Sequence, residues 1–131
     1  MLFFDLIISR IIICKVQKCY NMSKKGIVYL LADTLNDGLY KIGVTTGTID
    51  KRISKLQTGN AGEIYACRIY ETDYPFMIEK KLHRKYTGAN VLNEWFKLSD
   101  DDVERFSSDC QKEEEAIEAL KDNPFFSKYL K

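Results

Sequence analysis

Two side chains able to exchange protons or bind cations lie in a stretch expected to be helical, from Pro75 to about Thr87. Glu79 and His83 stand four residues apart, so a helix places them on one flank. Spacing alone is equally consistent with a surface pair that contributes only about 0.2–0.5 kcal/mol. The stretch also carries Lys80, Lys81, Arg84 and Lys85. Such a run is most often a solvated face, but it also suits a polyanionic partner.

Another cation, Arg52, lies in a second expected helix that has Thr48 as its N-cap and Gly59 just past its end. This helix has one apolar stripe at i, i+4 and i+7, formed by Ile49, Ile53 and Leu56. Arg52 lies beside the stripe, whereas Lys51 and Lys55 point elsewhere. An arginine on a helix flank usually makes a surface ion pair worth about 0–1 kcal/mol. Its place beside the stripe instead favours a role at the sheet.

The sheet that must position these helices is expected to begin with a hairpin. Residues 28–32 and 39–44 are rich in β-branched and aromatic side chains, and Asn36-Asp37-Gly38 lies between them. Residues 63–72 predict a third strand. Its alternation puts Ile64, Ala66 and, to a lesser degree, Arg68 on one face, and Tyr65, Cys67 and Ile69 on the other. Residues 91–98 predict a short closing strand, in which Trp95 and Phe96 are expected to pack in the core or at its lip; stacking on nucleobases is the less favoured alternative.

The C-terminal part, residues 99–131, is acidic. It has five basic and ten acidic residues, whereas residues 22–98 have twelve and eight. Ser99 followed by Asp102 predicts a capped helix to about Phe106, and a separate acidic helix is expected from Gln111 to Lys121. The last aromatic and apolar side chains are expected to dock on the domain; they are Phe125, Phe126, Tyr129 and Leu130.

The N-terminal residues 1–21 are apolar, but Asp5 and Arg10 interrupt them. A membrane-spanning helix needs about 20 apolar residues, and the segment also lacks the order of a secretory signal. We therefore expect no membrane partner. We expect Met22 to be the initiator; the alternative is an extra amphipathic strand or helix packed on the domain.

Composition favours one core: the chain has 131 residues, of which 45% are hydrophobic and 30% charged. The four cysteines form no CxxC pair, so a structural zinc site is not expected. Scattered thiols of this kind predict a reducing compartment. The predicted organisation is therefore an N-terminal extension (1–21), a domain (22–98) and an acidic helical extension (99–131). The predicted fold class is α+β, with a small mixed or antiparallel sheet of three to four strands flanked by helices.

Taken in order, these features resemble the GIY-YIG nuclease superfamily, and more narrowly its branch in phages, prophages and large viruses, which is usually labelled a DNA-binding domain. The resemblance covers roughly residues 26–98. The motifs that carry it are Ile27-Val28-Tyr29, Tyr40-Lys41-Ile42-Gly43, Arg52 with Leu56-Gln57-Thr58-Gly59-Asn60, Glu79-x-x-Leu82-His83, and Glu94-Trp95-Phe96.

The resemblance implies hydrolysis of DNA phosphodiesters with a single Mg²⁺ or Mn²⁺ ion. By position it implies that Glu79 holds the ion, that Tyr29 orients or deprotonates the attacking water, and that Arg52 stabilises charge on the phosphate. The chemistry is consistent: hard cations prefer carboxylate oxygens, metals activate water, and guanidinium groups match phosphate oxygens.

This chain departs from the superfamily pattern at its second tyrosine, which directly precedes Ile-Gly elsewhere and is Lys41 here. Tyr40 is one residue earlier, and strand side chains alternate, so Tyr40 is expected to face the core and Lys41 the site. Lys41 could then bind phosphate or supply a proton, or mark a site kept for binding alone. The superfamily also has a polar residue that contacts the site, and by position it corresponds here to either Asn90 or Asn93.

The leading hypothesis is a GIY-YIG-type DNA endonuclease or nickase that uses Tyr29, Lys41, Arg52, Glu79 and His83 around one metal ion, without a small-molecule cofactor. DNA is then expected along the basic residues Lys51, Lys55, Lys80, Lys81, Arg84 and Lys85. A non-catalytic DNA-binding module is the main alternative, and a protein-interaction domain whose acidic tail contacts the basic face is the third. The expected location is the cytoplasm, or the host cytoplasm or nucleus for a viral protein.

Overall fold

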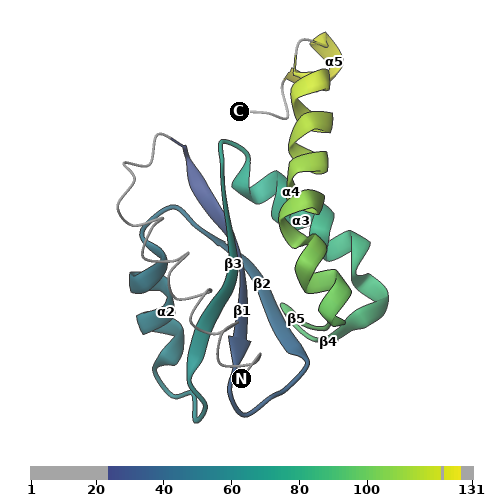
Figure 1. The fold of residues 1–131 in the computed structure, drawn as a ribbon. Coiled ribbons are helices and arrows are strands. Elements are labelled where there is room, and N and C mark those ends of the chain that lie inside the picture. The colour runs from purple at the N-terminus through teal and green to yellow at the C-terminus, as the bar shows by residue number, and fades with distance from the viewer. Residues whose placement is uncertain (1–23, 122, 128–131) are drawn as a thin grey trace.

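A five-stranded antiparallel sheet with strand order β3-β1-β2-β5-β4 forms the centre of the protein (Figure 1). The computed structural model describes residues 24–121 and 123–127. The expected N-terminal extension and the expected docking of Tyr129 and Leu130 lie outside these residues. The predicted α+β class is confirmed, with one more strand than expected.

The predicted hairpin is confirmed. It consists of β1 (Gly26–Asp33) and β2 (Leu39–Thr45), and every residue of β1 is buried. Gly38 closes the turn with φ +82°, a conformation that most side chains disfavour. Because β1 lies between β2 and β3, it is the most enclosed strand, and its side chains are divided between two cores.

The third strand, β3 (Ile64–Thr72), pairs with β1 through an irregular register. Leu30 faces Arg68 and Leu31 faces Ala66, so the intervening Cys67 is an extra residue on β3. The alternation therefore reverses beyond Cys67. Ile69 joins Ile64 and Ala66 in one core, and Arg68 turns to the opposite side, where it meets Glu104 at 3.2 Å. The expected placement of Ile69 and Arg68 was wrong because uniform alternation does not allow for a bulge.

The closing segment is a second hairpin instead of a single strand. It consists of β4 (Asn90–Leu92) and β5 (Trp95–Lys97), with Asn93 at the turn in a left-handed conformation, φ +53°. Asparagine tolerates this conformation better than most residues, and its side-chain type is common in tight turns. β5 continues the sheet beside β2, and β4 forms its edge.

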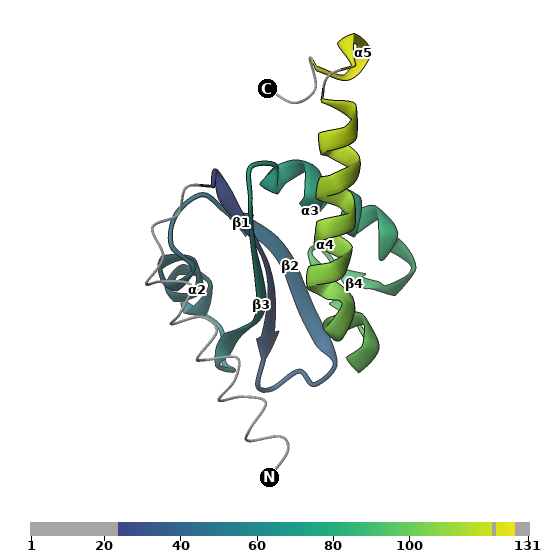
Figure 2. The same cartoon turned by 45° about the horizontal axis from the view of Figure 1, so that its top comes forward.

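The two faces of the sheet carry different helices (Figures 1 and 2). On one face α2 (Ile49–Gln57) packs Ile49, Ile53 and Leu56 against β1 and β3. The predicted cap is confirmed, because the Thr48 side chain accepts a hydrogen bond from the Lys51 backbone amide. On the other face α3 (Pro75–Lys85) buries Ile78 and Leu82, and a short 3₁₀ turn, Thr87–Ala89, leads to β4.

The C-terminal part contains one continuous helix of 21 residues, α4 (Asp100–Leu120), where two were expected. The Ser99–Asp102 capping box is confirmed at its start. Ser107 and Ser108 are weak helix formers, but a stripe formed by Val103, Phe106, Cys110 and Ile117 packs in the same core as α3 and overrides that preference. The core of residues 22–98 thus continues into α4.

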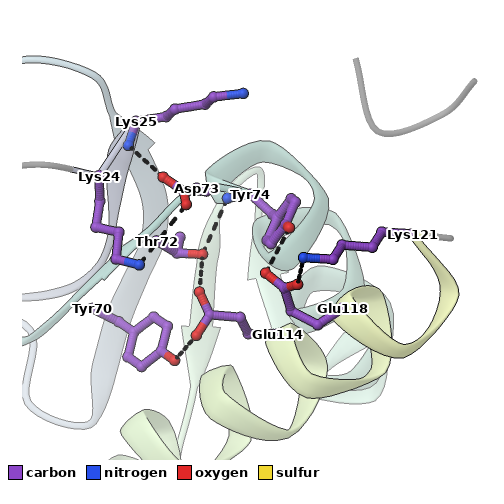
Figure 3. A network of polar contacts seen from close by, with 9 residues as sticks. All are labelled: Lys24, Lys25, Tyr70, Thr72, Asp73, Tyr74, Glu114, Glu118 and Lys121. Atoms are coloured by element: carbon purple, nitrogen blue, oxygen red, sulfur yellow. Dashed lines mark hydrogen bonds and ion pairs between the residues drawn. The ribbon is translucent and has the colours of Figure 1, made fainter. Parts of the chain in front are cut away.

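Carboxylates on α4 bind hydroxyl groups of β3 and α3 (Figure 3). Glu114 accepts from the Tyr70 hydroxyl at 2.5 Å and from Thr72 at 2.7 Å, and Glu118 accepts from Tyr74 at 2.7 Å. Nearer the start of the helix, the buried Asp109 accepts from the Tyr86 hydroxyl at 2.7 Å. The acidic face of α4 is therefore a packing surface, because its carboxylates satisfy the polar groups of the elements beneath it.

The chain ends, as far as it is described, with α5 (Pro124–Ser127). Phe125 is 79% exposed, so the expected docking of this side chain was wrong. No helix among the described residues combines the length and apolarity needed to cross a bilayer.

Asp109 offers a test of this packing. It is 3% exposed, and it pairs with Lys85 at 2.9 Å as well as with Tyr86. Burial raises the pKa of Asp109, but the hydrogen bonds from Tyr86 and Lys85 outweigh that effect and lower the pKa below its ordinary value. We expect Asp109→Ala to reduce the free energy of unfolding by about 3 kcal/mol at pH 7, because it leaves a buried hydroxyl and a cation without a partner.

The measurement is urea unfolding, with Glu104→Ala as the control, since Glu104 pairs with Arg68 at the surface. The control should lose no more than about 1 kcal/mol. The Asp109 contribution is complete above the unfolded pKa of about 3.9 and is lost as the pH falls through the lower folded pKa, so the two proteins should converge in acid. Equal losses in the two variants at pH 7 would contradict the packing role.

Candidate active site

Tyr29 and Gly43 face each other across the β1–β2 pair, and the tyrosine ring lies over the glycine. A Cβ atom built on Gly43 would lie 2.5 Å from the Tyr29 hydroxyl oxygen, a separation that real Cβ atoms do not reach. Gly43 therefore gives the Tyr29 ring the space to cross β2. The ring is fully buried, and its hydroxyl lies on the α2 side of the sheet.

Arg52 reaches this hydroxyl from α2. Its Nε–H donates to the Tyr29 oxygen at 3.0 Å, so Arg52 has a role at the sheet and is not a surface ion pair. Burial raises the pKa of Tyr29, and the arginine opposes this effect without cancelling it. Tyr29 is consequently a neutral phenol at neutral pH. Because its oxygen accepts from Arg52, its own proton remains to be donated to another group.

Lys41 lies on the same face as Tyr29, since it pairs with Leu31, two residues along β1. Its ammonium group binds Glu94 at 2.6 Å and lies 5.8 Å from the centre of the Trp95 ring. The Lys41 side chain is only 12% exposed. Tyr40 lies in the opposite core, as its offset of one residue predicts.

His83 and Glu79 approach the same place from α3, at the edge of β2. β5 pairs with β2 only as far as Lys41, and beyond this point His83 Nε2 donates to the Ile42 carbonyl at 2.9 Å. The imidazole ring also packs on Phe96, with centroids 5.1 Å apart. His83 thus takes the place of a strand partner and fixes α3 against the sheet, one helical turn from Glu79.

Glu79 is half-buried, and among the described residues its carboxylate makes no hydrogen bond or ion pair. Burial raises its pKa; Glu94 adds to this effect, and His83, Lys41 and Arg52 oppose it. Glu79 and Glu94 in turn contribute to raising the pKa values of Tyr29 and Arg52. The other four predicted site residues and Glu94 therefore lie within electrostatic range of Glu79.

Glu94 was not among the predicted site residues, although it belongs to the Glu94-Trp95-Phe96 motif. The signal was present in its position: an acidic residue beside the start of a short strand that pairs with the lysine strand. It was missed because the closing segment was expected to be one strand. The turn at Asn93, which directs Glu94 toward Lys41, was not predicted.

The predicted DNA-binding cations divide into two groups. Lys81 binds Glu113 at 3.2 Å and Lys85 binds Asp109 at 2.9 Å, so these two contribute to the packing of α3 on α4, and their contact with DNA stays a prediction. The others are exposed and make no ion pair within the described part of the chain: Lys51 and Lys55 on α2, and Lys80 and Arg84 on α3.

Neither candidate asparagine belongs to this cluster of side chains. Asn90 donates to the backbone carbonyls of Asn93 and Trp95, at 2.7 and 3.2 Å, and Asn93 supplies the left-handed turn. Both residues shape the β4–β5 hairpin that carries Glu94.

The Leu56-Gln57-Thr58-Gly59-Asn60 motif has a structural role. The Gln57 side chain accepts from the Ile64 amide at 2.8 Å and donates to the Gly62 carbonyl at 2.7 Å. Asn60 donates to Asp33 at 3.1 Å and also to Gly62. These bonds join the end of α2 to β1 and β3, and so they set the position from which Arg52 reaches Tyr29.

The residues present suit a metal ion that retains most of its water. The described residues contain no cluster of three histidine, cysteine, aspartate or glutamate side chains able to hold a metal. A closed protein cage is therefore absent from this part of the chain. Glu79 is nevertheless a half-buried carboxylate without a partner in residues 24–121 and 123–127, and Mg²⁺ is commonly bound by one or two carboxylates, water and substrate phosphate.

Comparison with known proteins places the chain in a sequence family. The family model described as the T5orf172 domain matches residues 26–118, from β1 through most of α4. Searches of curated proteins and of solved structures gave no significant match. The match spans well over half of the chain and includes the acidic helix that the sequence resemblance left out.

The environment of Tyr29 can be measured by its ionisation. We expect the spectrophotometric titration of the wild type minus that of Tyr29→Phe to show a phenol that ionises above its ordinary pKa of about 10, because the site buries it. Tyr65→Phe, which alters a half-buried tyrosine of β3, is the comparison. A Tyr29 phenol that ionises below pH 9 would contradict the neutral hydroxyl described above.

Proposed function

The chain belongs to the T5orf172 domain family, and from this premise we propose that it is a metal-dependent DNA endonuclease or nickase of the GIY-YIG type. The observation that supports the proposal is the combination of a phenol bonded to a guanidinium group, an ammonium group bonded to a carboxylate, and a second carboxylate within electrostatic range of both pairs. These groups come from β1, α2, β2, the β4–β5 turn and α3. This combination suits phosphodiester hydrolysis, in which charge grows on phosphate while water attacks.

Arg52 binds and stabilises the scissile phosphate. Its Nε–H is committed to Tyr29, and its two terminal nitrogens remain to donate to phosphate oxygens. The hydrogen bond to a buried ring also fixes the direction of the guanidinium group, so less side-chain entropy is lost when phosphate binds.

Tyr29 orients the attacking water. Its raised pKa makes a phenolate unfavourable at neutral pH, so of the two roles implied by the resemblance, orientation fits better than deprotonation. The hydroxyl accepts from Arg52 and donates its proton to the water or to a phosphate oxygen.

Glu79 holds the divalent cation. When bound, Mg²⁺ or Mn²⁺ supplies Lewis-acid polarisation of the phosphate and lowers the pKa of water. The local charges explain why the cation is needed: Glu79 and Glu94 offset Arg52 and Lys41, so without it a phosphodiester gains little from entering. His83 is a positioning residue, because it fixes α3 to the Ile42 carbonyl.

DNA approaches over the exposed cations at either side of this point. They are Lys51 and Lys55 on α2, and Lys80 and Arg84 on α3. Contacts of this kind bind phosphates without regard to sequence, and they weaken as salt rises.

A non-catalytic DNA-binding module is the second candidate. One observation favours it: Lys41 stands where the superfamily has its second tyrosine, and its ammonium group is neutralised by Glu94. In this function the same cations bind DNA and Glu79 serves no reaction.

Nicking of supercoiled plasmid separates the two functions. We expect the wild type to convert plasmid to the open circular form in Mg²⁺ or Mn²⁺ but not in EDTA. We expect Glu79→Gln and Arg52→Lys each to slow this conversion by about a hundredfold or more, because each removes a charge or a geometry that acts on the phosphate.

Glu104→Gln and Arg105→Lys are the matched controls, since they make the same chemical changes at exposed positions of α4. The controls should nick at the wild-type rate. Plasmid that is retarded equally by all five proteins and nicked by none would exclude the endonuclease and leave the binding module.

A further inference from the structure

The α2 side of the sheet is only partly covered by helix. α2 packs on β1 and β3, through Ile49, Ile53 and Leu56, and these residues contact no side chain of β5 or β4 in the same core. Figures 1 and 2 both place α2 over the β1–β3 part of the sheet, away from β4. The outer half of this face therefore lacks a helix among the described residues.

Strand register identifies the side chains on this uncovered half. Lys41 pairs with Trp95, and Trp95 pairs with Leu92, so the three share the face that also carries Tyr29. Lys97 lies two residues beyond Trp95 and joins them. The result is a row that runs outward from the site: a lysine, a tryptophan and a leucine, with a second lysine beside the tryptophan.

Large apolar and aromatic side chains in this row are not fully buried. Leu92 is 65% exposed, Trp95 is only partly buried, and Lys97 is exposed with no ion pair among the described residues. Phe96, the neighbour of Trp95, is instead 1% exposed in the opposite core. The core therefore does not account for Trp95 and Leu92, and a large aromatic group beside a cation is a surface suited to a nucleobase and its phosphate.

We propose that this surface, Trp95 with Leu92 and Lys97, binds an unpaired nucleotide of the DNA strand whose phosphate lies at Arg52. The proposal rests on the proposed function. Trp95 provides the face on which a base stacks, Leu92 packs against the edge of that base, and Lys97 binds the phosphate. The surface is continuous with the proposed phosphate site, because Lys41 contacts both Glu94 and the Trp95 ring.

A fully paired duplex cannot offer a base to this surface without unstacking it. DNA with a bulge, gap or flap offers one at little cost. The preferred substrate class is therefore DNA with an unpaired nucleotide next to the cleaved phosphodiester.

The test exploits the fact that Trp95 is the only tryptophan in the chain. The full chain is titrated with Ca²⁺ in place of Mg²⁺, so that a cation is available to Glu79 while the strict octahedral geometry of Mg²⁺ is absent and cleavage is disfavoured. The two DNAs are a perfect duplex and the same duplex carrying one bulged nucleotide. Trp95 emission should be quenched by the bulged DNA and little changed by the duplex. Anisotropy of labelled DNA should show about tenfold tighter binding of the bulged form, the contribution of one stacked base.

Variants separate stacking from folding. Trp95→Leu and Leu92→Ser should each reduce the preference for bulged DNA, and Trp95→Phe should retain most of it. Leu35→Ser is the matched control, because Leu35 is 66% exposed and lies in the β1–β2 turn; it should leave the preference unchanged.

The outcomes distinguish this inference from the function on which it rests. Equal binding of the two DNAs with unchanged Trp95 emission, while Glu79-dependent nicking persists, would overturn the nucleotide surface and leave the endonuclease. Absence of binding to either DNA at low salt would overturn both. Loss of the preference in Leu35→Ser to the same degree as in Leu92→Ser would also overturn it.

Discussion

The site depends on the space that Gly43 leaves for the Tyr29 ring. A side chain at residue 43 would occupy the position of the tyrosine hydroxyl, and Arg52 would then lose the buried acceptor that orients it. A fully buried ring on an inner strand is among the least mobile groups in a small protein, because every rotamer change disturbs close-packed neighbours. Because Gly43 and Tyr29 belong to the rigid β1–β2 pair, the Tyr29 hydroxyl holds the Arg52 guanidinium group in one direction.

The acidic helix supports the other half of the site. Glu79 and His83 belong to α3, and α3 is held between the sheet and α4 by Asp109, which binds Tyr86 and Lys85, and by the Lys81–Glu113 pair. The charge segregation along the chain therefore has a structural cause. Negative charge on α4 satisfies cations and hydroxyl groups of the domain itself, and exposed cations remain on α2 and α3, the helices that carry Arg52 and Glu79.

Local patterns were sufficient to predict much of this architecture from the sequence. The β1–β2 hairpin, the caps at Thr48 and Ser99, the apolar stripe of α2 and the placement of Lys41 on the same face as Tyr29 follow from alternation, turn chemistry and helix periodicity. What could not be predicted depends on contacts between distant segments. The bulge at Cys67 and the pairing of Lys81 and Lys85 with α4 leave no local signal, and the continuity of α4 through Ser107 and Ser108 comes from packing that overrides propensity. Glu94 was missed for the same reason, since its role depends on a turn at Asn93.

The central claim is that Glu79 holds a divalent cation beside Tyr29 and Arg52. Paramagnetic broadening in ¹H–¹⁵N spectra during a Mn²⁺ titration tests it most directly, because it locates the ion without requiring turnover. The account predicts that the amides around Glu79, Gly43 and Glu94 broaden first in the wild type and that Glu79→Gln abolishes this selectivity. Broadening that begins at the acidic start of α4, around Asp100 and Asp101, and is unchanged in Glu79→Gln would contradict it.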